Sequence, residues 1–145
     1  MIKVKFDDKQ VKRALRRLDK AVDNVKPALK DIADKEVRLA QNRIRIKKTD
    51  PDGRPWRPWS YATLQYRIRQ GNVGKGLLYS NGLLARSFDT DVSRNELTVS
   101  NSAPYATYLQ EGTPNMPSRK FLGWGNKSIK SAADILLKYL KGKLK

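Results

Sequence analysis

The sequence contains no cysteine and no histidine, and these two absences exclude several kinds of functional site. Without cysteine, the chain has no disulfide, no thiolate metal ligand and no cysteine nucleophile. Without histidine, it lacks the commonest general base and the commonest metal ligand. Most hydrolase, zinc and redox mechanisms are therefore excluded, and we expect no metal, no cofactor and no enzymatic activity.

Long apolar runs are also absent. No stretch approaches the ~20 apolar residues that a membrane-spanning helix needs, so we expect no membrane partner. The N-terminal segment MIKVKFDDKQ lacks the apolar stretch of a signal peptide. We therefore expect a protein that is made and used in the cytosol.

Acidic residues are scarce: 14 Asp and Glu stand against 31 Lys and Arg, which leaves a net charge of +17 on 145 residues. Such a charge favours anionic partners, namely nucleic acid, an acidic protein surface or anionic lipid, although it can also serve solubility alone. The basic excess lies mainly before residue 48 and after residue 125. The length predicts a single domain over residues 1–145, large enough to bury a core.

The N-terminal third has the pattern of one strand and two helices. Residues 2–6 alternate apolar and basic side chains, which predicts a short strand. Apolar residues at helical spacing then predict a helix over 7–25. Pro27 either kinks this helix or opens the next one, which continues to about Lys47. We expect both helices to be long and amphipathic, with an apolar face and a very basic face.

The centre and C-terminal part predict a small antiparallel sheet followed by a helix. Residues 48–59 form a long Pro/Gly-rich loop, in which Asp50, Asp52 and Gly53 favour a turn over a calcium loop. A helix capped by Ser60 follows, with Leu64 and Ile68 facing inward. Strands over 85–92 and 96–100 are joined by a tight turn at 93–95, and a helical turn then ends at Gly112. The C-terminal helix is amphipathic, with its apolar stripe at Ile129, Ala132, Ala133, Leu136, Leu137 and Leu140. Together these elements predict an α+β domain.

Catalytic groups do not gather anywhere in the sequence. Asp89, Asp91 and Glu96 lie close together, and clustered carboxylates can hold Mg²⁺. At the end of a predicted hairpin, however, such carboxylates are usually solvated. The serine residues have no histidine to activate them. The sequence therefore favours a protein that is not an enzyme.

Nucleic-acid binding is an alternative function. The candidate phosphate contacts lie on the solvent side of the first predicted helix: Lys12, Arg13, Arg16, Arg17 and Lys20. No helix-turn-helix, zinc or RNA-binding motif accompanies them. The aromatic residues Trp56, Trp59, Tyr61 and Tyr66 could stack on bases, or they could pack in a core or an interface.

Four central stretches, 52–64, 77–88, 96–113 and 116–124, occur in an order and at a spacing that resemble a known family. This is the phage virion morphogenesis, or tail-completion, family of Mu-like and related tailed phages, which is similar to minor tail-component proteins. The matching positions are Gly53, Trp56, Ser80, Gly82, Leu83, Tyr105, Ala106, Gly112, Thr113, Pro117, Arg119, Phe121, Leu122 and Gly123. The chain departs from the family pattern at Leu109–Glu111, Ser118 and Lys120.

The resemblance implies a structural protein of the virion tail or neck, present in the host cytoplasm during assembly. Its members are thought to form a ring of identical subunits that completes the tail so that head and tail join. The partners would be copies of itself, tail-tube proteins and neck or head-completion proteins, with non-specific DNA contact as a further interaction. The candidate interface residues are Trp56, Trp59, Tyr105, Pro117, Arg119, Phe121, Leu122 and Trp124.

The segment NMPSRKFLGW, residues 115–124, shows why these residues are candidates. It combines the cations Arg119 and Lys120 with the large apolar side chains of Phe121, Leu122 and Trp124. Aromatic and Arg residues are enriched at interface hot spots. Two interpretations remain open: the segment seals the domain's own core, or it packs against a neighbouring subunit. In the second case Arg119 would pair with a carboxylate or with backbone carbonyls across the contact between subunits.

Overall fold

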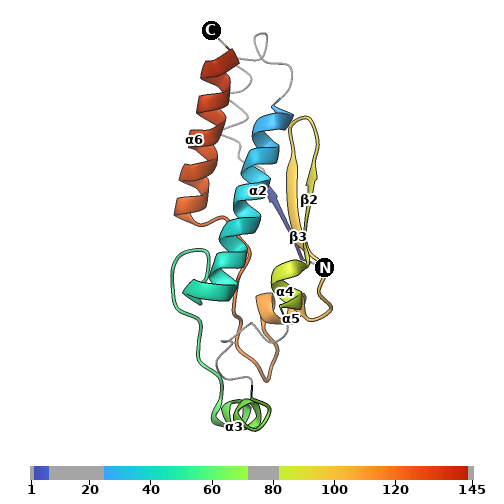
Figure 1. Ribbon diagram of the computed structural model, residues 1–145, viewed down its shortest axis with the longest axis vertical. Coiled ribbons are helices and arrows are strands. Elements are labelled where there is room, and N and C mark those ends of the chain that lie inside the picture. The colour runs from blue at the N-terminus through green and yellow to red at the C-terminus, as the bar shows by residue number, and fades with distance from the viewer. Residues whose placement is uncertain (1, 7–24, 72–81, 144–145) are drawn as a thin grey trace.

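The computed structural model describes residues 2–6, 25–71 and 82–143, without the side chains of 2–6 and 143. Helix α2 (Lys26–Asn42) lies between two layers (Figure 1). The antiparallel helix α6 (Asn126–Lys143) packs on one side of α2, and the sheet packs on the other side. This arrangement confirms the predicted α+β class.

Helix α2 begins one residue before Pro27, a position where the missing N–H of proline costs nothing. It continues into a π-helical turn, η1 (Arg43–Lys47), and ends where Lys48 adopts a left-handed conformation with φ 55°. This confirms the second predicted helix and its end at Lys47, and it shows that Pro27 opens the helix. The helix expected over 7–25 lies outside the described residues.

The sheet has three antiparallel strands in the order β1 (Ile2–Phe6), β3 (Leu97–Asn101), β2 (Phe88–Val92). The predicted hairpin is confirmed: Phe88 pairs with Asn101 and Val92 with Leu97, and the Ser93 N–H donates to the Glu96 carbonyl at 2.8 Å. Because β3 is central, β1 and β2 are both edge strands.

The prediction of a strand beginning at Ala85 was wrong, because residues Leu83–Arg86 form the short helix α4. Gly82 precedes it with φ 80°, a conformation that glycine adopts at little cost. The Ser87 hydroxyl donates to the Leu83 carbonyl at 2.6 Å and closes the turn. Leu84 and Ala85 are thereby buried as a helical pair, and β2 begins only at Phe88.

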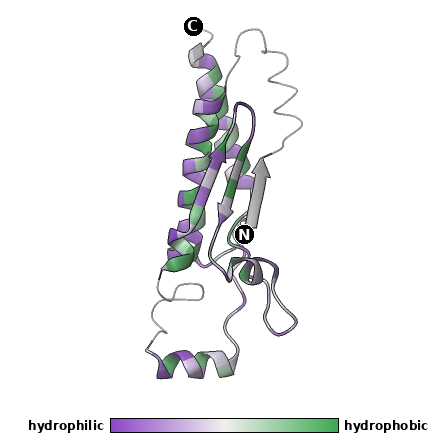
Figure 2. Cartoon of the chain, turned by 90° about the vertical axis from the view of Figure 1, so that its right-hand side faces the viewer, coloured by the Kyte–Doolittle hydropathy of each residue, from purple (hydrophilic) through white to green (hydrophobic). Residues whose placement is uncertain are grey.

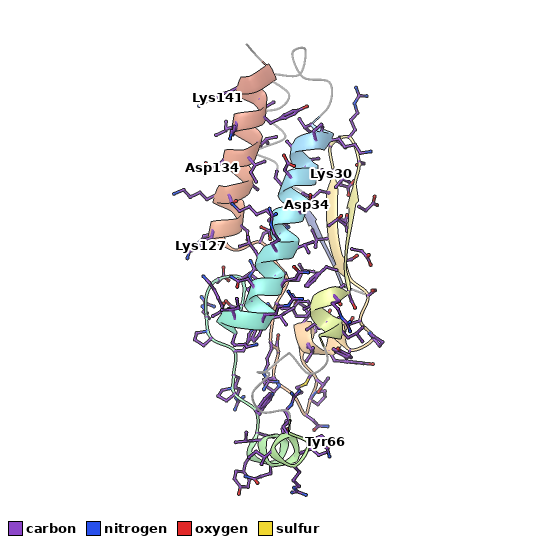
Figure 3. All side chains as sticks on the ribbon, viewed as in Figure 1. Lys30, Asp34, Tyr66, Lys127, Asp134 and Lys141 are labelled. Atoms are coloured by element: carbon purple, nitrogen blue, oxygen red, sulfur yellow. The ribbon has the colours of Figure 1, made fainter. Side chains whose placement is uncertain are left out.

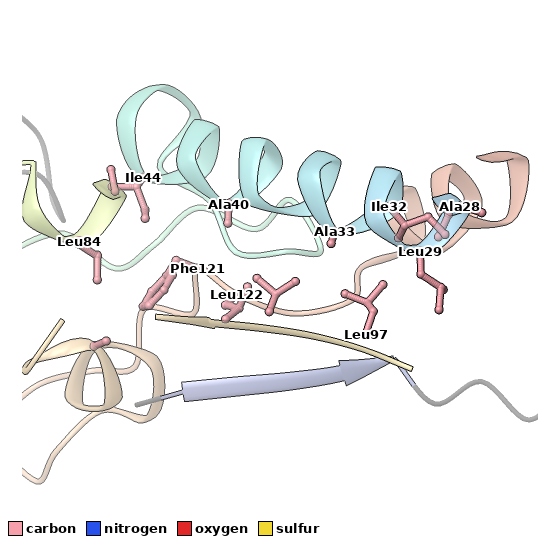
Figure 4. Close-up of a cluster of buried hydrophobic side chains, with 14 of the residues drawn as sticks. Ala28, Leu29, Ile32, Ala33, Ala40, Ile44, Leu84, Leu97, Phe121 and Leu122 are labelled. Atoms are coloured by element: carbon pink, nitrogen blue, oxygen red, sulfur yellow. The ribbon is translucent and has the colours of Figure 1, made fainter. Parts of the chain in front are cut away.

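The core forms where α2 faces β3 (Figure 4). Leu29, Ile32 and Ala33 of α2 lie opposite Leu97, and Phe121 and Leu122 fill the space further along, below Ala40. Phe121 and Leu97 are fully buried. Burying a side chain of this size contributes about 1.5–3 kcal/mol relative to leaving it exposed.

Helix α6 confirms the predicted C-terminal helix but has a narrower apolar face than expected. Ala132, Leu136 and Leu140, spaced four residues apart, are buried. Ile129 and Leu137 are 44% and 53% exposed, so their predicted place in the stripe was wrong. Among the described residues, the helix that packs against α6 is α2, which covers only a narrow face of it, and the flanking apolar positions Ile129 and Leu137 lie outside that contact.

Candidate interaction site

Residues 115–124, here called the clamp segment, follow the short helix α5 (Ala106–Glu111). Helix α5 ends at Gly112, as predicted, with φ 77°. A Cβ at Gly112 would lie 2.8 Å from the Ser118 backbone nitrogen, so the chain passes too closely for any side chain there. The Arg119 N–H then donates to the Leu109 carbonyl at 2.7 Å. The clamp segment is therefore folded back against α5.

The apolar end of the clamp segment belongs to the core of its own chain. Phe121 is 0% exposed and meets Phe88 edge to face, with 6.0 Å between the ring centroids. Leu122 is buried, and Trp124 is partly buried against the same core. Within the single chain, these side chains seal the domain's own core, which is the first of the two interpretations that the sequence left open. Their part in a contact between subunits stays a prediction.

Gln110 holds this turn of the clamp segment through three hydrogen bonds from one side chain. Its Oε1 accepts from the backbone N–H groups of Phe121 and Leu122, both at 3.2 Å, and its Nε2 donates to the Leu122 carbonyl at 2.6 Å. The Ser118 hydroxyl also donates to the Gln110 carbonyl at 2.6 Å. The amide thus satisfies backbone groups that would otherwise lack partners.

The clamp segment also holds the loop that precedes helix α3 (Tyr61–Arg69). The buried Arg119 donates from Nε to the Arg57 carbonyl at 2.8 Å and from Nη2 to the Pro58 carbonyl at 3.0 Å. The buried Trp56 donates from Nε1 to the Lys120 carbonyl at 2.7 Å. Arg119 therefore pairs with backbone carbonyls of its own chain, and its pairing across a subunit contact stays a prediction. We call this set of three hydrogen bonds the clamp.

Positive charge accumulates at the clamp. Burial, followed by the charges of Arg67 and Arg57, lowers the pKa of Arg119. Arg67 lies over the Trp59 ring, 4.4 Å from its centroid, which is a cation–π contact. Its Nη1 is buried and has no hydrogen-bond partner in the described part of the chain. Arg57 and Arg67 are therefore close enough to Arg119 for their charges to act on it, and Arg67 also contacts the Trp59 ring.

Beyond the clamp, α3 forms an arm, residues 57–71, that lies apart from the body in two perpendicular views (Figures 1 and 2). Ser60 caps the helix as predicted, accepting from the Thr63 N–H at 3.3 Å. No residue of α3 is buried, and Ile68 is 51% exposed, so its predicted inward position was wrong. Tyr61 and Tyr66 are 78% and 62% exposed, and Figure 3 shows Tyr66 at this end of the molecule.

A cleft of about 620 Å³ lies between the start of the arm and the turn before the clamp segment. Its walls are residues 57–60 on one side and 113–117 on the other. Two predicted interface residues, Trp59 and Pro117, line it and are half-buried. Tyr105, at the start of α5, is 37% exposed. These three residues can contact a partner, whereas Trp56, Arg119, Phe121 and Leu122 face inward.

A buried polar cluster supports the clamp segment from the α2 side. Arg43 donates from Nη1 to the Phe121 carbonyl at 3.1 Å and from Nη2 to the Ser128 hydroxyl at 3.2 Å. Glu36 is buried beside them. Burial raises the pKa of Glu36, while the hydrogen bond from Ser128 and the charge of Arg43 act in the opposite direction. Burial likewise lowers the pKa of Arg43.

Sequence reasoning missed Gln110, Arg43 and the exposed face of α3 as parts of this site. Neither Gln110 nor Arg43 stands out in the sequence, because polar or charged residues lie beside both. The nucleic-acid candidates Lys12, Arg13, Arg16, Arg17 and Lys20 lie outside the described residues.

No group of three or more acidic side chains in the described residues is placed to hold a metal ion. The Asp50 turn is confirmed as a turn: its Oδ1 accepts from the backbone N–H groups of Asp52 and Arg54, both at 2.9 Å. Among the described residues, no helix is both long enough and apolar enough to cross a membrane.

Comparison with known proteins places this fold in a biological context. A Mu-like prophage protein of Haemophilus influenzae, FluMu G protein 1, is 28% identical over 142 residues, covering 93% of this chain and 92% of its own length. No solved structure matches the chain significantly. The model of the phage virion morphogenesis family matches residues 6–141, which is nearly the whole sequence. The chain therefore belongs to the phage virion morphogenesis family, and its role lies in the assembly of phage particles.

Proposed function

We propose that this protein is a structural, non-enzymatic component that completes the phage tail or neck, so that heads and tails join. The observation that carries the proposal is an arm that the chain's own core fixes in place but leaves uncovered. Arg119 and Trp56 hold its first residues with three hydrogen bonds, while no residue of α3 is buried. A fixed, exposed helix suits a protein whose task is to bind other virion subunits.

The proposed assembly is a ring of identical subunits that contacts tail-tube and neck or head-completion proteins. Trp59 and Pro117 are half-buried and line the cleft, and Tyr105 is exposed, so these three are the predicted interface residues best placed for such contacts. The net charge of +17 supports an acidic partner surface, or DNA passing through the ring.

The experiment is to delete the gene from the phage and to examine lysates by negative-stain electron microscopy. Filled heads and loose tails, with few joined particles, are the expected result. Supplying the wild-type gene from a plasmid should restore joined virions. If the deletion lysate contains normal joined virions, the proposed function is wrong.

Nucleic-acid binding by the basic residues is the alternative function, and salt dependence separates it from assembly. A DNA-binding protein loses affinity with a slope of about −0.9 in log K against log salt for each phosphate contacted. On the assembly proposal, purified protein binds DNA weakly and without sequence preference, and the deletion phenotype does not depend on that binding.

A further inference from the structure

Helix α3 is too short and too exposed to be stable by itself. It has nine residues, and isolated helices shorter than about 12–15 residues are marginal in water. Most helices in proteins gain their stability by packing an apolar face, yet Tyr61, Tyr66 and Ile68 are all more than half exposed. The Ser60 cap and the clamp secure its beginning, and the contact of Arg67 with the Trp59 ring is what ties its last turn to the preceding loop. This helix therefore has the properties of a surface that is covered in the assembled state.

The charge of the arm indicates what covers it. No acidic residue lies between Asp52 and Asp89, whereas the arm contains Arg57, Arg67 and Arg69. At the clamp, Arg57 and Arg67 lie close enough to Arg119 to disfavour its charged form. The buried Nη1 of Arg67 has no acceptor among the described residues. A partner that brings carboxylates to the exposed part of the arm would reduce the repulsion between these guanidinium groups.

The chain itself carries a matching acidic surface on β2. Asp89 and Asp91 are exposed and lie two residues apart, so both project from the same face of the sheet. Strand β2 is an edge strand of the sheet, so its outer backbone groups have no neighbouring strand within the described part of the chain. No ion pair between either carboxylate and another described residue is present in the structure. The arm lies at one end of the molecule, whereas β2 lies along its side (Figure 1).

We infer that the arm of one subunit docks on the β2 edge of a second copy of this chain, with Arg67 and Arg69 facing Asp89 and Asp91. Because arm and edge are different patches, the contact is head-to-tail, and it can repeat from subunit to subunit until a ring closes. The apolar side chains Tyr66 and Ile68 would be covered in the same contact. The inference deepens the proposed ring and rests on it.

Charge reversal tests the contact directly with the full-length protein. The arm variant is Arg67→Glu with Arg69→Glu, and the edge variant is Asp89→Lys with Asp91→Lys. Self-association is measured by sedimentation velocity over a range of concentrations, and circular dichroism confirms folding. Each variant alone should associate at least about tenfold more weakly than wild type. An equimolar mixture of the two variants should regain higher oligomers in which the variants alternate, because each arm then meets an edge of opposite charge. The fourfold variant should regain higher oligomers by itself.

A matched control separates local pairing from overall charge. Lys127→Glu with Lys141→Glu changes the net charge as much as the arm variant does, at exposed positions of α6 (Figure 3). This control should associate like wild type. If Arg67→Glu disturbs the Trp59 contact, Arg69→Glu paired with Asp91→Lys alone gives the same test.

Several results would overturn the inference. These are a monomeric wild-type protein at every concentration, a mixture of variants that stays monomeric, or equal losses in the arm variant and the α6 control. Arm variants that lose only DNA binding, or only binding to an acidic virion protein, would show another occupant. The sedimentation assay uses purified protein and does not depend on the deletion experiment. Normal virions in the deletion lysate would therefore refute the proposed function without refuting the contact between the arm and β2.

Discussion

Replacing Arg119 with methionine tests whether the clamp holds the arm to the core. The change removes the hydrogen bonds to the Arg57 and Pro58 carbonyls and keeps a side chain of similar length. Hydrogen bonds from a charged group contribute about 1.5–3 kcal/mol each, so two correspond to roughly 3–6 kcal/mol. Two effects offset part of this loss. Water can reach the exposed residues 57 and 58, and the repulsion from Arg57 and Arg67 disappears.

We therefore expect Arg119→Met to lower the free energy of unfolding by about 2–3 kcal/mol. In urea denaturation this corresponds to a midpoint about 1–2 M lower. The matched control is Arg54→Met, which removes an exposed arginine from the same loop and should change stability by less than about 0.5 kcal/mol. Limited trypsin digestion should cut Arg119→Met faster at Arg67 and Arg69, because the arm is released.

Equal stability of Arg119→Met and Arg54→Met, together with unchanged cleavage rates, would refute the reasoning. It would mean that the buried guanidinium contributes no net stability after its desolvation.

Three further predictions concern the elements that support the clamp segment. Gln110→Leu leaves two backbone N–H groups and one carbonyl without their partner, so the free energy of unfolding, measured by urea denaturation, should fall by about 2–4 kcal/mol. A fall below about 1 kcal/mol would contradict the role given to the Gln110 amide. Gly125→Ala places a Cβ 2.0 Å from the Pro51 carbonyl oxygen and should lower the melting temperature by several degrees. The control Gly142→Ala, in open space on α6, should raise the melting temperature slightly. Similar shifts in the two variants would contradict this prediction and show that the loop at Pro51 moves aside at little cost. Glu36 binds a proton more readily in the folded state, so the free energy of unfolding should fall as the pH rises from the ordinary carboxyl pKa of 4.5 through the raised pKa of the folded state. Glu36→Gln should lack this decline. The same pH profile in the variant and the wild type would show that Glu36 does not cause it.

The sequence predicted those elements whose periodicity is long or whose turn chemistry is local. Helix α2, the hairpin of β2 and β3, the Ser60 cap and the end of α5 at Gly112 are all of this kind. The start of β2 was misplaced because a short apolar run such as Leu83–Ala85 fits a strand or a helical turn equally well. Periodicity also places apolar residues on one face without showing that anything covers them, which is why Ile68, Ile129 and Leu137 were assigned wrongly.

The candidate site was predictable in its residues but not in its connections. The composition of residues 115–124 singled out Arg119 and Phe121, and both are central to the structure. Their partners could not be predicted, because Arg119 binds carbonyls about 60 positions away in the sequence and Gln110 binds backbone groups on the far side of a turn. The exposed arm depends on what the rest of the fold leaves uncovered, and a local pattern does not contain that information.

The central claim is that this protein joins finished heads to finished tails, and in vitro complementation tests it most directly. Purified wild-type protein is added to a lysate of the gene-deleted phage, and infectious titre and joined particles are counted before and after addition. The account predicts that both rise together, in proportion to the protein added, and that the arm variant restores neither. Loose heads and tails that stay separate and non-infectious after addition of folded wild-type protein would contradict the account.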